Sequence, residues 1–140
     1  QWCAGFLNDQ YLRNTGHPVP VLMSPELTFP QFAGWMREHR PDAILHADRD
    51  DRLTDWLERC GARVPDDVGH ACLDLSADDR ANTGIDPEAR RVGAAAMELL
   101  AAARGRNERG EPEHPMTVLV KGTWQAGNST RHQNAARPGT

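Results

Sequence analysis

The sequence predicts an α/β fold built on a parallel β-sheet with helices on both faces. Apolar residues at helical spacing alternate along the chain with short apolar runs. These runs show little alternation of polar and apolar residues, which is typical of strands that are covered on both faces. Because parallel neighbours must be joined by a crossover that packs on the sheet, the alternation of helices and strands indicates a layered α/β domain.

The N-terminal half contains clear signals for helix ends. Thr28 and Gln31 have the spacing of a capping box, and Pro41 disfavours a helix that continues beyond Arg40. Gly61 is a natural C-terminal cap for the next helix. We therefore expect a helix at residues 2–13, a strand at 19–23, a helix ending near Arg40, a strand at 42–47, a helix at 51–59 and a strand at 68–73.

The C-terminal half contains one long amphipathic segment. Asp86 followed by Pro87 has the pattern of an N-cap and a first helical residue, and apolar residues at helical spacing continue the helix to Ala103. After it we expect a polar connector at residues 105–115, a last apolar run at 117–120 and a disordered tail from about Arg131.

The composition excludes several classes of protein. A chain of 140 residues with 39% hydrophobic residues is long enough for one domain with a core. Its net charge of -4 opposes the phosphates of DNA and anionic lipids, so we expect no direct binding of nucleic acid or membrane by this chain. No apolar run approaches the roughly 20 residues of a membrane span. The three cysteines form no CxxC pair, which indicates reduced, buried thiols in a cytoplasmic protein.

Three polar residues directly follow predicted strands. Ser24 follows the strand at 19–23, Asp48 the strand at 42–47, and Asp74 the strand at 68–73. Loops at the carboxyl ends of parallel strands converge on one crevice, where carboxylates and a hydroxyl can bind the hydroxyl groups of a sugar. The alternative is that both aspartates cap the following segments or lie in solvent, and Asp48 in particular fits an acid-rich helix N-terminus.

Other kinds of site have weaker support. His46 and His70 lie in adjacent predicted strands, and a metal site that they form with Asp48 is one alternative; buried, hydrogen-bonded histidines are favoured because no HxH or HExxH spacing occurs. No GxSxG, GxxxxGK[ST] or GxGxxG motif is present, so we expect no catalysis and no cofactor. A small hydrolase that uses Asp48 and Asp74 as a carboxylate pair stays open as an alternative.

Three segments of the chain carry motifs that resemble those of one protein family. In CGARVPDDVGHACLDLS, residues 60–76, a helix ends at Gly, a Val-Pro-x-Asp-Val turn follows and a strand delivers an Asp. GIDPEARRVGAAAMELL, residues 84–100, has the pattern of an extended piece that leads into a helix, and VLVKGTWQAGNST that of a terminal strand. These segments resemble the effector-binding domain of LacI/GalR-type transcription regulators. The resemblance covers roughly residues 1–130 and is closest to a branch similar to xylose regulators.

This resemblance implies a periplasmic-binding-protein-like type I fold, whose two lobes close on an effector. Residues 1–104 would form the C-terminal lobe, residues 105–130 a connector with the terminal crossover strand, and residues 131–140 the disordered tail. It also implies that the helix-turn-helix domain, the hinge helix and most of the N-terminal lobe are missing from this chain.

The resemblance also assigns positions to the site. Asp74 matches the effector-binding Asp of the family, and Ala47 with Asp48 falls where many members have an Asn-Asp or Gly-Asp pair. Trp2 occupies the position at which well-known members have an Arg that grips the effector. An indole that stacks in place of a cation favours a neutral sugar over an anionic effector.

The resemblance therefore implies the sugar-sensing module of a cytoplasmic transcription regulator. We expect the whole protein to be a homodimer with the helix at 51–59 in its interface, where Leu53 or Trp56 lies partly at the seam. Operator DNA would be bound only through the missing N-terminal domain. The main alternative is a periplasmic sugar-binding protein for transport, which shares the fold and the crevice.

Overall fold

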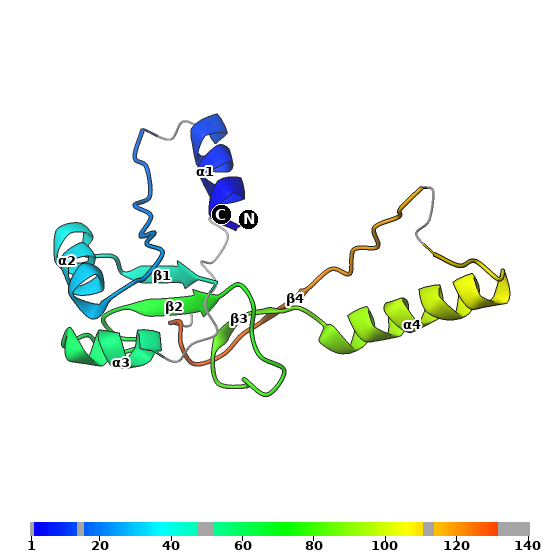
Figure 1. The fold of residues 1–140 in the computed structure, drawn as a ribbon. Coiled ribbons are helices and arrows are strands. Elements are labelled where there is room, and N and C mark those ends of the chain that lie inside the picture. Colours follow the sequence, from blue (N-terminus) through cyan, green and yellow to red (C-terminus); the bar gives the residue numbers. More distant parts are fainter. Residues whose placement is uncertain (1, 14–15, 48–51, 111–113, 132–140) are drawn as a thin grey trace, which may run out of the picture.

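A four-stranded sheet forms the centre of the molecule (Figure 1). The computed structural model describes residues 2–13, 16–47, 52–110 and 114–131. The strands are β1 (Ala43–His46), β2 (Gly69–Cys72), β3 (Thr83–Asp86) and β4 (Thr123–Gln125), and their order in the sheet is β1-β2-β3-β4. β1, β2 and β3 are parallel, and β4 pairs antiparallel with β3. The α/β class with a mostly parallel sheet is therefore confirmed.

Four helices accompany the sheet in the described residues: α1 (Trp2–Arg13), α2 (Phe29–His39), α3 (Arg52–Arg59) and α4 (Ala89–Gly105). The start of α2 agrees with the predicted capping box, since the backbone N–H of Thr28 donates to Gln31 Oε1 at 2.9 Å. Arg40 ends this helix in the left-handed region at φ 44°, directly before Pro41. None of the described helices is long and apolar enough to cross a membrane.

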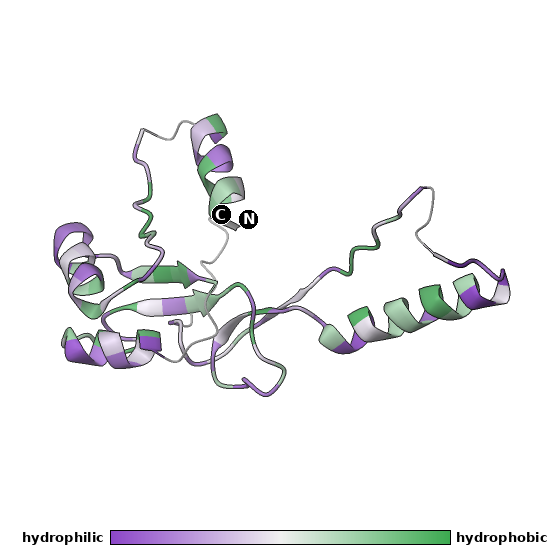
Figure 2. Ribbon diagram, viewed as in Figure 1, coloured by the Kyte–Doolittle hydropathy of each residue, from purple (hydrophilic) through white to green (hydrophobic). Residues whose placement is uncertain are grey.

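The core lies between the sheet and the pair of helices α2 and α3. Phe32 of α2, Leu57 of α3 and Val68 before β2 are buried together, and Ile44 of β1 packs against them. Leu45, the next residue of β1, is 58% exposed, because successive side chains of a strand point to opposite faces. In the described residues, α2 and α3 thus bury one side of β1, while the Leu45 side stays open (Figure 2).

The predicted strand at residues 19–23 is wrong. These residues have no regular structure, and Leu22 packs against the helical core instead of entering the sheet. Pro20 is the second residue of this run and cannot donate a backbone hydrogen bond to a neighbouring strand. Leu22 is the residue of this run that packs against the core, whereas Val19 and Met23 are exposed.

The C-terminal strands also differ from the prediction. Residues 117–120 form no strand, and β4 follows at Thr123–Gln125. β3 was not expected from hydrophobic pattern, because its sequence Thr-Gly-Ile-Asp has only one large apolar residue. Its closeness to β2 depends on Gly84: a Cβ at this position would lie 2.1 Å from the carbonyl oxygen of Cys72.

The predicted N-cap of the long helix is wrong as well. Asp86 is the last residue of β3, and Glu88 precedes α4 in the left-handed region at φ 57°. Asp86 Oδ1 nevertheless accepts the backbone N–H of Glu88 at 2.8 Å, so its carboxylate stabilises the turn between strand and helix. α4 itself extends away from the sheet (Figure 1).

Two of the three cysteines are not buried as predicted. Cys72 of β2 is buried, but Cys3 and Cys60 are exposed. Cys60 directly follows α3, which ends at Arg59, and begins the next turn. Its position is therefore no longer set by the helical repeat.

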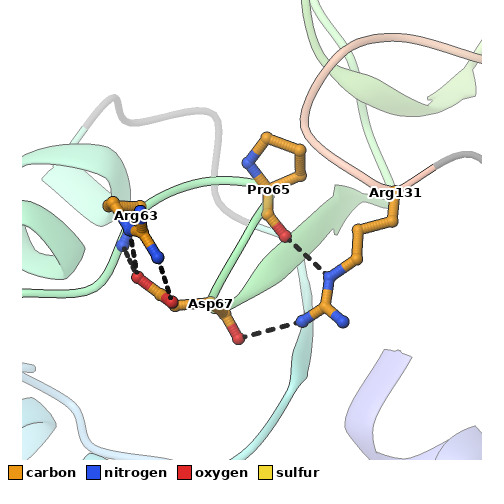
Figure 3. A network of polar contacts seen from close by, with 4 residues as sticks. All are labelled: Arg63, Pro65, Asp67 and Arg131. Carbon is orange, nitrogen blue, oxygen red and sulfur yellow. Dashed lines mark hydrogen bonds and ion pairs between the residues drawn. The ribbon is translucent and has the colours of Figure 1, made fainter.

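An arginine near the C-terminus ties the chain back to the turn before β2 (Figure 3). Arg131 donates to the carbonyl oxygens of Pro65 and Asp67 at 3.0 and 3.2 Å. The carboxylate of Asp67 in turn forms a two-pronged pair with Arg63, with N···O distances of 2.9 and 3.0 Å. This network joins the segment after β4 to the turn between α3 and β2.

Candidate functional site

The carboxyl ends of the three parallel strands define one edge of the sheet. β1 ends at His46, β2 at Cys72 and β3 at Asp86, and parallel pairing brings these ends to the same side. In open parallel sheets, this edge is where loops converge on a ligand. The residues that directly follow the strands are therefore the first candidates for binding.

Asp74 is held at this edge from both sides. The residue before it, Leu73, donates its backbone N–H to the carbonyl oxygen of His46 at the end of β1, at 2.7 Å. The residue after it, Leu75, is 2% exposed and donates to the carbonyl oxygen of Ile85 in β3, at 2.9 Å. The backbone N–H of Asp74 also lies 3.4 Å from Cys72 Sγ. The backbone of the half-buried Asp74 is thus held where the loop passes from β1 to β3.

A second group of polar residues lies at the same edge and was not predicted as part of a site. Asp86 ends β3 and pairs in register with Thr123 of β4. Thr123 Oγ1 donates to Glu88 Oε1 at 2.9 Å, and Arg91 Nε lies 3.3 Å from Glu88 Oε2. Hydrophobic pattern did not indicate β3, so Asp86 was interpreted as a helix cap. The resemblance implied that residues 84–100 begin with an extended piece before the helix, and this was the signal that could have placed Asp86 on a strand.

Of the other predicted site residues, the structure brings only Ala47 to this edge of the sheet among those it describes. Ala47 directly follows β1 and is exposed at the edge. Ser24 donates its hydroxyl to the carbonyl oxygen of Glu26 at 3.1 Å, which is a local turn, and no strand leads into it. Trp2 is the first residue of α1, but its side chain lies outside the described residues, as does all of Asp48.

His46 and His70 form a pair between β1 and β2. Their Nε2 and Nδ1 atoms are 3.3 Å apart, and His70 is only 4% exposed. Burial lowers the pKa of His70, and the adjacent His46 lowers it further, while Asp79 acts in the opposite direction. Within the described residues, no group of three potential ligands that could hold a metal ion occurs. The pair agrees with the interpretation of these residues as hydrogen-bonded histidines of the sheet.

A separate open groove of about 570 Å³ lies along α3. Its polar lining comes from Thr54 and Glu58 of α3 together with Arg63, His70, Asn82 and Ser129. Asp74 and Ala47 are not among the lining residues. The groove therefore does not coincide with the strand edge that the fold marks as the binding side.

A mostly parallel sheet accompanied by helices is an architecture whose carboxyl edge commonly binds ligands. Residues 7–130 match the model of the periplasmic binding protein-like domain family, and the chain belongs to this family. The periplasmic-binding-protein-like fold that the sequence resemblance implied is thus confirmed. A search of curated proteins finds no match to the chain.

A solved structure supports the same fold. The chain is similar to the transcription regulator CcpA of Lactococcus lactis, with a TM-score of 0.58 and 16% sequence identity. The similarity covers 91% of this chain and 49% of the regulator, so the chain spans about half the length of that protein.

Proposed function

We propose that this chain is the effector-sensing module of a LacI/GalR-type transcription regulator and that its effector is a small carbohydrate. Membership in a family of binding domains supports a binding role, and the similar solved structure is that of a transcription regulator. Operator DNA would be bound by a separate domain of the complete protein, which we place in the cytoplasm.

The observation that carries this proposal is the position of Asp74. Backbone hydrogen bonds hold its two neighbours, Leu73 and Leu75, to β1 and β3, so the backbone at Asp74 needs little reorganisation when a ligand binds. A carboxylate can accept two hydroxyl groups of a sugar in charge-assisted hydrogen bonds. Ala47 lies at the end of the adjacent strand, and Asp48 and Trp2 complete the proposed site through the family resemblance.

The same hydrogen bonds offer a route from the effector to the rest of the protein. The loop that contains Asp74 is bonded to β3, and β3 leads directly into α4. A ligand that binds one arrangement of this edge more tightly would shift the population of the whole protein toward that arrangement. A DNA-binding domain elsewhere in the protein would respond to this shift in the population of the two arrangements.

We also propose that the complete protein is a homodimer with α3 in its interface. Leu53 and Trp56 pack against the core of Phe32, Leu57 and Val68, so they contribute little surface to a partner. The exposed side of α3, which includes Arg52, Asp55 and Arg59, is the surface available to a second copy. Sedimentation of the complete protein at micromolar concentration tests this, and a monomer would contradict it.

The effector proposal is tested by screening neutral monosaccharides against the complete protein. A sugar that binds only the folded state must raise the thermal midpoint of unfolding. Sugars that do so are then titrated calorimetrically into wild-type protein and the Asp74→Asn variant. Equal affinities of the two proteins would show that the site lies elsewhere.

A further inference from the structure

Two histidines lie on the face of the sheet that packs against the apolar core. Ile44 of β1 pairs in register with His70 of β2, and His46 follows Ile44 by two residues. Since side chains two residues apart share one face of a strand, and residues in register share one face of the sheet, all three lie together. Ile44 packs against the buried core. Imidazole groups on such a face cost free energy of desolvation that apolar side chains avoid, and exceptions of this kind are expected at functional sites.

The two imidazole rings face each other through their nitrogens. Nε2 of His46 lies 3.3 Å from Nδ1 of His70, and the ring centroids are 5.3 Å apart. This separation is long for a hydrogen bond, in which an N–H donor and its acceptor are commonly about 2.7 to 3.2 Å apart. The pair therefore leaves room for more than a shared proton.

The same separation is that of two nitrogens bound to one tetrahedral metal ion. Imidazole nitrogens bind Zn²⁺ at about 2.0 to 2.1 Å, and the tetrahedral angle then places two of them about 3.3 Å apart. A right angle, as at a square-planar or octahedral ion, would place them about 2.9 Å apart. The two strands thus hold the histidines at the spacing for a tetrahedral ion, and the backbone does not have to move.

An ion can reach this pair from solvent. His46 is half-buried, and His70 lines the open groove along α3. Within the part of the chain that the structure describes, no group of three potential ligands occurs, so the two histidines would be the protein ligands there. Water from the groove can fill the other coordination positions, as it does at metal sites that keep an open position.

The charges around His70 favour a cation. Asp79 acts electrostatically on His70, and three hydrogen bonds from the loop that follows Asp79 hold its carboxylate. Glu58 adds a second carboxylate to the lining of the groove, whereas the guanidinium of Arg63 in the same lining is paired with Asp67. A cation is therefore attracted to this pair more strongly than an anion.

We propose that His46 and His70 bind a tetrahedral divalent transition-metal ion of the Zn²⁺ class. The ion is bonded to Nε2 of His46 and Nδ1 of His70, and each ring then carries its proton on the nitrogen that faces away from the ion. It joins β1 to β2 one residue before Ala47, at the strand end where the edge with Asp74 begins. The site is separate from the proposed function, because no part of it requires the sugar.

Titration of the complete protein with Co²⁺, without sugar, tests the site. Tetrahedral Co²⁺ absorbs visible light far more strongly than the octahedral hydrated ion, so we expect intense bands that saturate at one ion per chain. Zn²⁺ binds such sites more tightly than Co²⁺ and should abolish these bands when it is added. Weak, octahedral absorption throughout the titration would overturn the proposal.

Two variants each remove one ligand. His46→Gln and His70→Gln should each weaken Co²⁺ binding at least about a hundredfold, because loss of a residue that merely supports a ligand already costs roughly ten- to hundredfold. His114→Gln removes an exposed histidine of the segment after α4 and should bind as wild type does. Wild-type affinity in either variant of the pair would show that the ion binds elsewhere.

A third measurement does not depend on the folding of a variant. NMR of the imidazole nitrogens in the wild-type protein should show shifts at Nε2 of His46 and Nδ1 of His70 when Zn²⁺ is added, with the other nitrogen of each ring still protonated. Shifts confined to other histidines, or none, would refute the assignment of the two ligands.

Discussion

The backbone N–H of Leu73 donates to the carbonyl oxygen of His46 at 2.7 Å, which continues the β1–β2 ladder one residue beyond the two strands. Asp74 is the next residue, and Leu75 after it is already bonded to β3. Asp74 therefore lies where the chain passes from β1 to β3. The position of its backbone depends on hydrogen bonds that a substitution of the Asp74 side chain does not remove.

The first prediction follows from this geometry. Asp74→Asn keeps the shape of the side chain and the backbone bonds around it, so the thermal midpoint should change little. Loss of a charged hydrogen-bond partner costs about 1.5 to 3 kcal/mol, which corresponds to a roughly ten- to hundredfold weaker sugar affinity by calorimetry. Asp78→Asn, an exposed aspartate of the same loop, serves as the control and should bind as wild type does.

The second prediction concerns the close approach of β2 and β3. A Cβ at Gly84 would lie 2.1 Å from the carbonyl oxygen of Cys72, which is backbone and cannot move aside cheaply. Gly84→Ala should lower the free energy of unfolding by more than about 2 kcal/mol, as measured by urea denaturation. Gly93→Ala in α4 is the control, because nothing lies within 4 Å of its Cβ and alanine favours a helix by up to about 1 kcal/mol. A Gly84→Ala protein as stable as wild type would contradict the β2–β3 register.

The third prediction is a loss of stability in mild acid. Burial, and then His46, lower the pKa of His70 below its ordinary value of 6.5, so the folded state binds a proton there less readily than the unfolded chain. The contribution of His70 to the free energy of unfolding is therefore complete above pH 6.5 and decreases as the pH falls below that value. When the pH is lowered from 8 to 5, the thermal midpoint of unfolding should decrease less in the His70→Gln variant than in the wild-type protein. Parallel curves would show that His70 is not the group responsible.

A fourth prediction tests the network near the C-terminus. The hydrogen bonds from Arg63, its side chain first and then its backbone, hold the pKa of Asp67 at about 2, below the ordinary value of 3.8. In Arg63→Met the side-chain partner is lost, and the pKa of Asp67 should rise toward 3.8 when followed by NMR titration. The stability that the pair contributes is present above pH 3.8 and is lost as the pH falls through 2. An unchanged pKa would mean that the pair does not persist in solution.

Local sequence signals predicted those elements whose ends depend on nearby residues. Thr28, Gln31 and Pro41 act within a few positions of the ends of α2, and the helix lies where they place it. The run at 19–23 was misjudged because an apolar run alone does not distinguish a strand from a segment that covers a core. Pro20 was the local signal against a strand.

Elements that depend on distant partners could not be predicted in this way. β3 has a single large apolar residue, and it is a strand because Gly84 allows it to approach Cys72 and because β4 pairs along its other side. The sequence analysis therefore interpreted Asp86 as a helix cap, although it is the last residue of β3. The fixed position of Asp74 likewise depends on His46 and Ile85, which hydrogen-bond its neighbours from two other strands.

The sequence by itself determined the α/β class, the four helices α1 to α4 apart from the start of α4, the strands β1 and β2, and the placement of Asp74 after a strand. Hydrophobic spacing, capping residues and proline act over a few residues, so they can be interpreted without a structure. Only the tertiary structure decided that β3 and β4 pair antiparallel, that Asp86 and Thr123 meet, and that α4 leaves the sheet with an apolar face that none of the described residues buries. These features depend on contacts between residues far apart in the chain, and the amphipathic pattern of a helix shows that one face must be covered without showing which part of the protein covers it.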